Sequence, residues 1–258
     1  MANWQDVLKI AREIDSPDKK RRFNKRHFTE AASRYDIATR AMSLGRDQAW
    51  KRALVAALAG GAEPVCVDLA SGTGDVAFLL GARFARGRIT GIDLTAEMVT
   101  LAQQRNRFSN VGFDCQDMGQ TSFASGSVDI VTGSYALRNA PDLAKGLEEV
   151  HRILKPGGEA AFLDFSKSGR PGMQALQYWL LKCWCGLWGT LLHGNPTIHA
   201  YIADSLKQFP SRADYHDLVR RSGFDIVASQ LFYFGMLELL VLRKPGPAPV
   251  PPPLAGGG

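Results

Sequence analysis

The chain has 258 residues and a mass of 28.2 kDa, a size that suits one domain with a full hydrophobic core. Hydrophobic residues make up 45% of the sequence, as in ordinary soluble proteins, and the formal net charge of +6 is modest. Cys183 and Cys185 lack a second cysteine pair or a histidine at ligand spacing, which argues against a metal site and for free thiols in a reducing compartment.

The first 60 residues are expected to form helices that precede the core. Ser16 is a typical N-cap, and Pro17 then occupies the first helical position. Residues 19–22 and 25–26 are all Lys or Arg. This basic cluster has three interpretations: a solvated helix face, contact with anionic lipid, or nucleic-acid binding, and no aromatic-interleaved basic motif supports the third. No signal peptide is expected, which favours a cytoplasmic protein, with peripheral contact to a membrane as the alternative.

A buried strand at residues 65–70 runs directly into a glycine-rich turn. Gly72 and Gly74 carry no Cβ, so the backbone can turn tightly and approach a ligand closely. A helical pattern follows at residues 76–80, and a strand, a glycine turn and a helix N-terminus together predict a nucleotide-binding crevice. The turn also fits the loose G-x-G-x-x-A pattern of dinucleotide sites. Asp75 disfavours that reading, because a carboxylate in the first helical turn repels a phosphate and tolerates a cationic ligand.

Two further features narrow the choice of nucleotide. Asp93 ends the next strand (residues 88–93), where a carboxylate can accept hydrogen bonds from both ribose hydroxyls. The turn at residues 154–158, Leu-Lys-Pro-Gly-Gly, separates a helix at 143–154 from a strand at 159–165. In this order and spacing, the three features resemble class I S-adenosylmethionine-dependent methyltransferases.

The pattern of strands agrees with this resemblance. Strands are also expected at residues 111–115, 128–134, 224–231 and 237–243. Alternation of strands and helices predicts an α/β fold with a parallel sheet. The resemblance implies a Rossmann-like methyltransferase core, a mostly parallel seven-stranded sheet with helices on both faces, a last strand that runs antiparallel and an N-terminal helical extension.

Four segments are similar to one subfamily, the ubiquinone/menaquinone biosynthesis C-methyltransferases. They are residues 28–36, 135–139 (Tyr-Ala-Leu-Arg-Asn), 164–167 (Asp-Phe-Ser-Lys) and 201–206. Several departures lie where a substrate pocket and its lid are expected. Thr39 replaces the family's usual Asn, Arg40 its usual acidic residue and Leu240 its usual histidine, and residues 167–200 match poorly. The cofactor is therefore better supported than the methyl acceptor.

The resemblance implies S-adenosyl-L-methionine as the cofactor. The implied cofactor-binding residues are Asp68, Ser71, Gly72, Thr73, Gly74, Asp93, Leu94, Asp117, Met118 and Ser134. Thr73 is expected to face the methionine part, Asp93 the ribose, and Ser134 the reacting methyl, while Asp117 and Met118 flank the adenine.

Three residues are predicted to act on the substrate. Arg138 stays charged and would stabilise a phenolate, Asn139 would position it, and Tyr35 would close over the cofactor. His199 and Tyr201 are weaker candidates. The predicted activity is C-methylation of a prenylated quinol, a demethylmenaquinol or a ubiquinol precursor. The alternatives are another lipophilic acceptor, such as a terpenoid or polyketide, and a non-catalytic scaffold of a biosynthetic complex.

The segment from residue 173 to residue 193 holds three of the five tryptophans. Its polar residues disfavour a membrane span. It is expected to be a lid helix, either packed on the core or lining a pocket for an isoprenoid chain and touching a bilayer. The domain division is a helical segment at 1–60, a core at 61–244 with a lid insertion near 168–210, and a disordered Pro/Gly tail at 245–258. Expected partners are a lipophilic small molecule and a second copy in a homodimer, with no nucleic acid and no metal.

Overall fold

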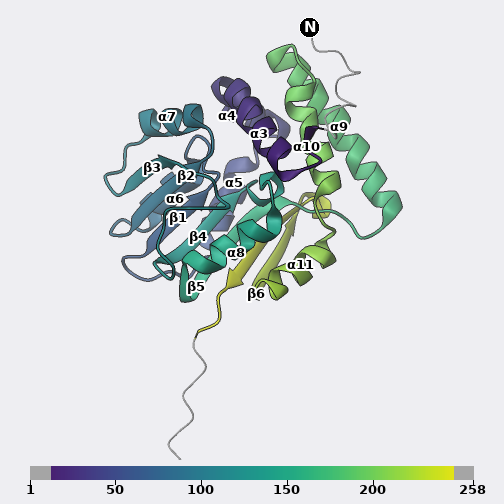
Figure 1. The fold of residues 1–258 in the computed structure, drawn as a ribbon. Coiled ribbons are helices and arrows are strands. Elements are labelled where there is room, and N and C mark those ends of the chain that lie inside the picture. The colour runs from purple at the N-terminus through teal and green to yellow at the C-terminus, as the bar shows by residue number, and fades with distance from the viewer. Residues whose placement is uncertain (1–12, 247–258) are drawn as a thin grey trace, which may run out of the picture.

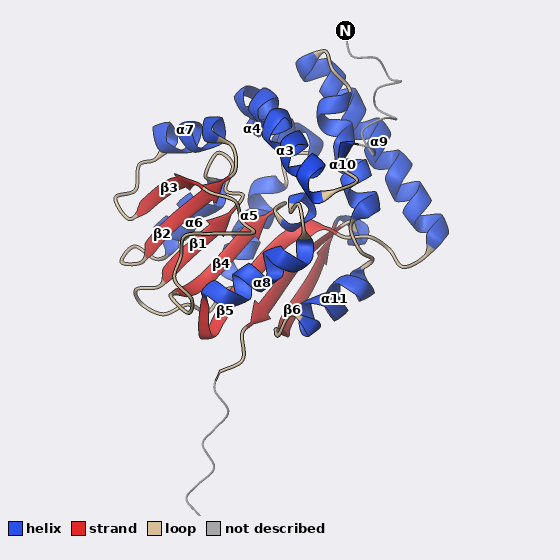
Figure 2. Ribbon diagram, in the orientation of Figure 1, coloured by secondary structure: helices blue, strands red, loops and turns tan. Residues whose placement is uncertain are grey.

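The computed structural model describes residues 13–246, so residues 1–12 and most of the predicted 245–258 tail lie outside the described residues. A seven-stranded sheet lies at the centre, with helices on both of its faces (Figures 1 and 2). In chain order the strands are β1 (Val65–Leu69), β2 (Arg88–Asp93), β3 (Val111–Cys115), β4 (Val128–Ser134), β5 (Leu154–Phe165), β6 (Asp225–Phe232) and β7 (Leu237–Arg243).

The sheet has the strand order β3-β2-β1-β4-β5-β7-β6. Parallel pairing joins β3, β2, β1, β4 and β5, and β7 runs antiparallel to both β5 and β6. The prediction of a mostly parallel seven-stranded sheet with an antiparallel last strand is confirmed.

The described helices are α3 (Pro17–Ala31), α4 (Tyr35–Met42), α5 (Asp47–Ala56), α6 (Asp75–Arg83), α7 (Ala96–Arg105), α8 (Leu143–Ile153), α9 (Pro171–His193), α10 (Thr197–Gln208) and α11 (Arg212–Arg221). Three short 3₁₀ helices are η1 (Ala32–Arg34), η2 (Leu137–Asn139) and η3 (Tyr233–Gly235). An N-terminal helical extension is therefore present, as predicted.

Alternating side chains of the strands build two cores, one on each face of the sheet. In β7, Leu240 and Leu242 join the core formed with α8, α10 and α11, whereas Leu239 and Val241 join the core formed with α5, α6 and α7. This two-residue period is the one expected for a sheet covered on both faces.

One predicted boundary differs from the structure. The turn at residues 154–158 was expected between a helix and a strand, but β5 begins at Leu154, which pairs with Val128. The register shifts before Glu159, and Gly157 adopts a φ of +79° within this irregular stretch. The Pro-Gly-Gly sequence therefore forms a bulge at the start of β5.

Helices α3, α4, α9 and α10 gather beyond the carboxyl ends of the parallel strands (Figure 1). Helix α9 packs along α10 and also contacts α4. It begins with Pro171 in its first turn and ends at Gly194, which has a left-handed φ of 64°. No helix within residues 13–246 is both long enough and apolar enough to span a bilayer. These helices therefore cover the carboxyl ends of the parallel strands, which is where ligands bind in open α/β folds.

Candidate active site

The glycine turn after β1 forms one wall of a cavity of about 50 Å³, which we call the glycine-turn pocket. Gly72 has a φ of +52°, and its N–H donates to Asp93 Oδ2 at 2.9 Å. The other carboxylate oxygen of Asp93 accepts from the Thr95 N–H at 2.9 Å. Burial raises the pKa of Asp93 although these backbone donors oppose it. The turn and the acidic end of β2 are therefore fixed relative to each other.

Six of the ten predicted cofactor-binding residues line this pocket: Gly72, Asp93, Leu94, Asp117, Met118 and Ser134. Ser134 Oγ is inaccessible to solvent and has no hydrogen-bond partner among the described residues, and the same is true of Ser71 Oγ. A buried hydroxyl without a partner is costly. The Ser134 hydroxyl, which lines the pocket, is therefore free to bond an incoming polar ligand, whereas Ser71 does not line it.

The structure places the other predicted cofactor residues behind the pocket wall. Asp68 Oδ1 accepts from Thr132 Oγ1 at 2.7 Å inside the sheet, and burial raises the pKa of Asp68 to about 7. The Thr73 hydroxyl donates to Asp36 Oδ1 at 2.6 Å, and Gly74 caps α6 with a φ of +93°. These residues fix the shape of the turn.

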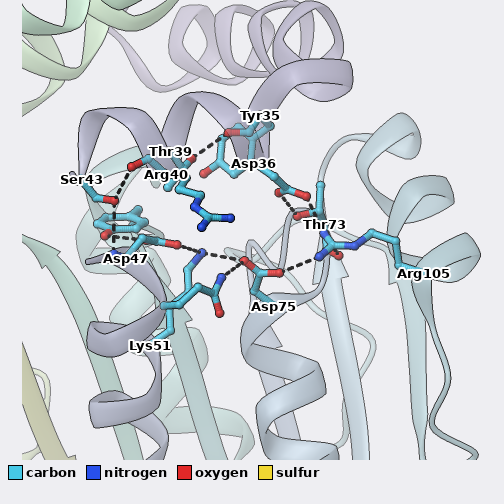
Figure 3. Close-up of polar contacts among 12 residues, drawn as sticks. Tyr35, Asp36, Thr39, Arg40, Ser43, Asp47, Lys51, Thr73, Asp75 and Arg105 are labelled. Carbon is cyan, nitrogen blue, oxygen red and sulfur yellow. Dashed lines mark hydrogen bonds and ion pairs between the residues drawn. The ribbon is translucent and has the colours of Figure 1, made fainter. Parts of the chain in front are cut away.

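Asp75 differs from its expected role. Its carboxylate does not line the pocket; it pairs with Lys51 Nζ at 3.0 Å and with Arg105 at 3.0 Å (Figure 3). Burial acts to raise the pKa of Asp75, but the two cations outweigh it and the net shift is downward. Lys51 also pairs with Asp47 at 2.6 Å. The Asp75 carboxylate was expected to tolerate a cationic ligand. Its ion pairs instead join α5 and α7 to the start of α6.

A second, larger cavity lies beside the first, between α3, α4, α9 and α10. Its volume is about 390 Å³, within the range of ligand sites, and most of its lining side chains are hydrophobic. We call it the apolar pocket. Its polar lining residues include Arg138, His27, His199 and Tyr201.

Phe28, Tyr35 and Tyr135 line both cavities, so the two pockets meet at these three rings. Tyr135 has a strained φ of 58°, and its hydroxyl donates to Asp47 Oδ1 at 3.0 Å. Burial raises the pKa of both tyrosines well above the ordinary value, so both rings remain neutral phenols. A group transferred between the pockets has to pass here.

Arg138 is a buried, positively charged residue that lines the apolar pocket and does not line the glycine-turn pocket. Its Nε lies 3.5 Å from Asp164 Oδ1, and its backbone N–H donates to Asp164 Oδ2 at 3.0 Å. The guanidinium also donates to Ser205 and lies over the rings of Phe165 and Tyr201, with centroids at 5.3 and 5.5 Å. These contacts fix the guanidinium without removing it from the pocket.

Asn139 is placed differently from its neighbour. It lines the glycine-turn pocket, and its Nδ2 donates to the Tyr135 carbonyl at 2.9 Å. Asn24 on α3 donates in turn to the Asn139 carbonyl at 2.7 Å. Asn139 therefore lies on the cofactor side, and only Tyr35 and Arg138 of the three predicted substrate residues reach the apolar pocket.

Two histidines reach the apolar pocket as neutral side chains. Burial lowers the pKa of His199 to about 4 and that of His27 to about 3. His199 Nε2 has no hydrogen-bond partner within residues 13–246. His199 was a weak candidate from the sequence, whereas the sequence analysis missed His27 and Tyr135 because no motif marks them as facing a common cavity.

Leu240 does not line the apolar pocket; it is buried in the core and pairs with Phe162. Its departure from the family pattern therefore does not change the pocket wall directly. The divergent segment 167–200 does contribute, through Leu180, Trp184 and Cys185 of α9.

Comparison with known proteins identifies the relatives of this chain. The model of the ubiE/COQ5 methyltransferase family matches residues 16–241. The ubiquinone/menaquinone biosynthesis C-methyltransferase UbiE of Desulfotalea psychrophila is 32% identical over 214 residues, covering 82% of this chain and 86% of the relative. That of Rubrivivax gelatinosus is 33% identical over 226 residues, covering 86% and 87%.

Solved structures show the same fold at lower identity. A chain of the complex between the Haloferax volcanii Trm112 methyltransferase activator and a methyltransferase has a TM-score of 0.62 at 20% identity, covering 84% of this chain and 97% of that one. Geranyl diphosphate C-methyltransferase from Streptomyces coelicolor has a TM-score of 0.58 at 17% identity, covering 76% and 78%.

Proposed function

Because this chain belongs to the ubiE/COQ5 methyltransferase family, we propose that it methylates a ring carbon of a prenylated quinol, of the demethylmenaquinol or ubiquinol-precursor type. It is an S-adenosylmethionine-dependent methyltransferase, and the identity of the acceptor is the new part of the proposal. The observation that supports this acceptor is the junction of the two pockets at Tyr35 and Tyr135, which joins the glycine-turn pocket to a hydrophobic cavity.

The residues of the glycine-turn pocket fit the cofactor. Asp93 keeps lone pairs for the ribose hydroxyls, and Ser134 Oγ is a buried hydroxyl in need of a partner. Asp117 and Met118 also line this pocket, and in this proposal they flank the adenine. When bound, S-adenosylmethionine supplies an electrophilic methyl group on a sulfonium. The cavity of about 50 Å³ is smaller than this ligand, so we propose that α3 and α4, which contribute Asn24, Phe28 and Tyr35 to the wall, move aside during entry.

The apolar pocket supplies what a carbon nucleophile needs. Ionisation of a ring hydroxyl pushes electron density onto the adjacent ring carbon, and a fixed cation beside that oxygen favours the ionised form. Arg138 is such a cation, and its hydrophobic surroundings keep its charge poorly screened. His199 is neutral, and its Nε2, which has no hydrogen-bond partner among the described residues, is available to accept a hydrogen bond from the ring hydroxyl. As the new bond joins the methyl to the ring carbon, the bond between that methyl and the sulfonium sulfur would break, and the proton on the ring carbon would then pass to water, which restores the aromatic ring.

The test is an assay with S-adenosylmethionine and either demethylmenaquinol or the ubiquinol precursor, with products read by mass spectrometry. A gain of one methyl on the ring is the expected result. Arg138→Met should lower turnover by about 10²–10³-fold, the usual effect of removing one oxyanion-stabilising donor, while calorimetry shows cofactor binding retained. Arg152→Met is the matched control, since Arg152 pairs with Glu149 on α8 and lines neither pocket. Equal turnover in both variants would contradict the role of Arg138.

A second acceptor class is supported by one observation. The α9 side of the apolar pocket is built by the segment that matches the family poorly, so a different lipophilic acceptor, such as a terpenoid or polyketide, is the alternative. Cofactor binding without methylation of either quinol would favour it.

A further inference from the structure

Helix α9 presents an uncharged, hydrophobic face to solvent. Its exposed large side chains follow the three- and four-residue spacing of one helix face: Met173, Leu176, Leu180, Leu187 and Leu191, with Trp179 beside them. Their exposed fractions run from 47% to 63%. Soluble proteins rarely leave so continuous a hydrophobic stripe uncovered, so this face is expected to contact something.

This face continues into the mouth of the apolar pocket. Leu180 and Trp184 line the pocket and are still 55% and 37% exposed. Leu44, in the turn after α4, and Tyr233, in η3, also both line the pocket and reach solvent. Trp184 Nε1 donates to the Met42 carbonyl at 3.1 Å and so joins α9 to the end of α4. The pocket therefore opens onto a hydrophobic rim built by three separate parts of the chain.

The backbone is strained at three exposed residues in or beside this rim. Leu44, Tyr233 and Phe234 have left-handed φ values of 52°, 52° and 56°, a region that large side chains avoid. Phe234 is fully exposed. A strained backbone that holds hydrophobic side chains in water is expected where those side chains have a function. We call Leu44, Tyr233, Phe234 and the exposed face of α9 the mouth surface.

Basic side chains predominate around the mouth surface, although the exposed Glu30 lies near His193 at the end of α9. Arg40 and Arg46 flank Leu44 in the chain; both are exposed, and neither has an ion-pair partner in the described part of the chain. Arg34 bonds the Leu192 carbonyl at the end of α9, and α9 itself contains no Asp or Glu. A second copy on this surface would bring like charges together and close the pocket mouth, whereas anionic lipid complements both the charge and the hydrophobic rim.

We propose that the mouth surface docks on an anionic lipid bilayer and that the acceptor enters the apolar pocket directly from the lipid. This inference deepens the proposed function and rests on it, because a lipophilic acceptor is the reason for the pocket to open toward a membrane. Trp179 and Trp184 are suited to the lipid–water interface, and Arg40 and Arg46 to the headgroups.

The test is flotation of the full chain with vesicles of phosphatidylglycerol and phosphatidylcholine, against vesicles of phosphatidylcholine alone. Wild type should bind the anionic vesicles, and added salt should weaken binding. Arg40→Gln with Arg46→Gln should weaken it roughly thirtyfold, since each basic side chain near an anionic surface contributes about 1 kcal/mol. Arg88→Gln is the control, because Arg88 is exposed at the amino end of β2, and the helices that carry the mouth surface lie beyond the carboxyl ends of the parallel strands.

The hydrophobic contribution is tested with Phe234→Gly and Trp179→Gln. Glycine accepts the left-handed φ at residue 234, so the fold is kept while the exposed ring is removed. Each variant should bind anionic vesicles about tenfold more weakly, in proportion to the apolar area lost. Val227→Ser is the control, since Val227 is 47% exposed near the start of β6, at the opposite end from η3.

A short-chain, water-soluble quinol separates this inference from the proposed function. None of these variants should lose turnover with that acceptor, because neither Phe234 nor Trp179 lines a pocket. Absence of vesicle binding by wild type that methylates the soluble quinol overturns the docking proposal alone. Absence of methylation overturns the proposed function. Light scattering that shows a dimer dissociated by Trp179→Gln, with vesicle binding unchanged, would place a second copy on the mouth surface and also overturn docking.

Discussion

Lys51 offers the sharpest test of how the N-terminal helices are held to the sheet. Its ammonium lies 2.6 Å from Asp47 and 3.0 Å from Asp75, and its side chain is only 8% exposed (Figure 3). Lys51→Met keeps the length of the side chain and removes the charge. Breaking a buried ion pair by removing one partner costs about 3–5 kcal/mol, because the other charge is left uncompensated.

The remaining contacts indicate that the loss in the free energy of unfolding lies toward the lower end of that range. Asp75 keeps Arg105 at 3.0 Å and Gln48 at 2.6 Å, whereas Asp47 keeps only the Tyr135 hydroxyl at 3.0 Å. In Lys51→Met, the carboxylate left without a cation is therefore mainly that of Asp47. A loss of about 3 kcal/mol in the free energy of unfolding corresponds to a Tm lower by about 6–12 °C for a chain of this size.

The assay is urea denaturation followed by circular dichroism. Adding Asp47→Asn to Lys51→Met should recover most of the loss, because the uncompensated carboxylate is then gone. Arg52→Met is the matched control: Arg52 is the next residue, is exposed and has no ion pair within residues 13–246, so it should change stability by less than about 0.5 kcal/mol. If Lys51→Met costs no more than Arg52→Met, or if the double variant is no more stable than the single one, the ion pair is not buried as described.

Two further predictions concern pH and the glycine turn. Because the pKa of His199 is lowered to about 4 in the fold, the unfolded chain binds more protons between pH 4 and 6.5, and stability is lost as the pH falls through that window. His199 should contribute about 3 kcal/mol to the loss at pH 4, and this contribution should be absent in His199→Gln; an unchanged pH slope in urea denaturation would contradict it. Gly74→Ala should cost about 1–3 kcal/mol, because its φ is +93° and a Cβ would lie 2.8 Å from Phe113 and Phe78. Gly112→Ala, where a Cβ meets no atom within 4 Å, is the control in thermal unfolding, and equal Tm values would refute the argument.

The sequence was sufficient for features that depend on local pattern. Alternating apolar residues located most of the strands to within a residue, and the glycine turn and Asp93 were predicted together because both lie at the carboxyl ends of adjacent strands. Contacts between distant residues carry no such pattern. The role expected for the Asp75 carboxylate differs from the one in the structure, because Lys51 and Arg105, 24 and 30 residues away, neutralise its charge. Likewise nothing in the sequence indicates that Tyr35 and Tyr135 share two pockets.

The position of Arg138 follows from the charge change in methyl transfer. A sulfonium loses its positive charge in the reaction, so a second cation beside it would raise the energy of the bound cofactor without helping the acceptor. Arg138 lines only the apolar pocket, and Asp164 at 3.5 Å partly balances its charge. Its field therefore acts mainly on the acceptor oxygen. This arrangement predicts that Arg138→Met lowers turnover without weakening cofactor binding, whereas a guanidinium in the glycine-turn pocket would affect both.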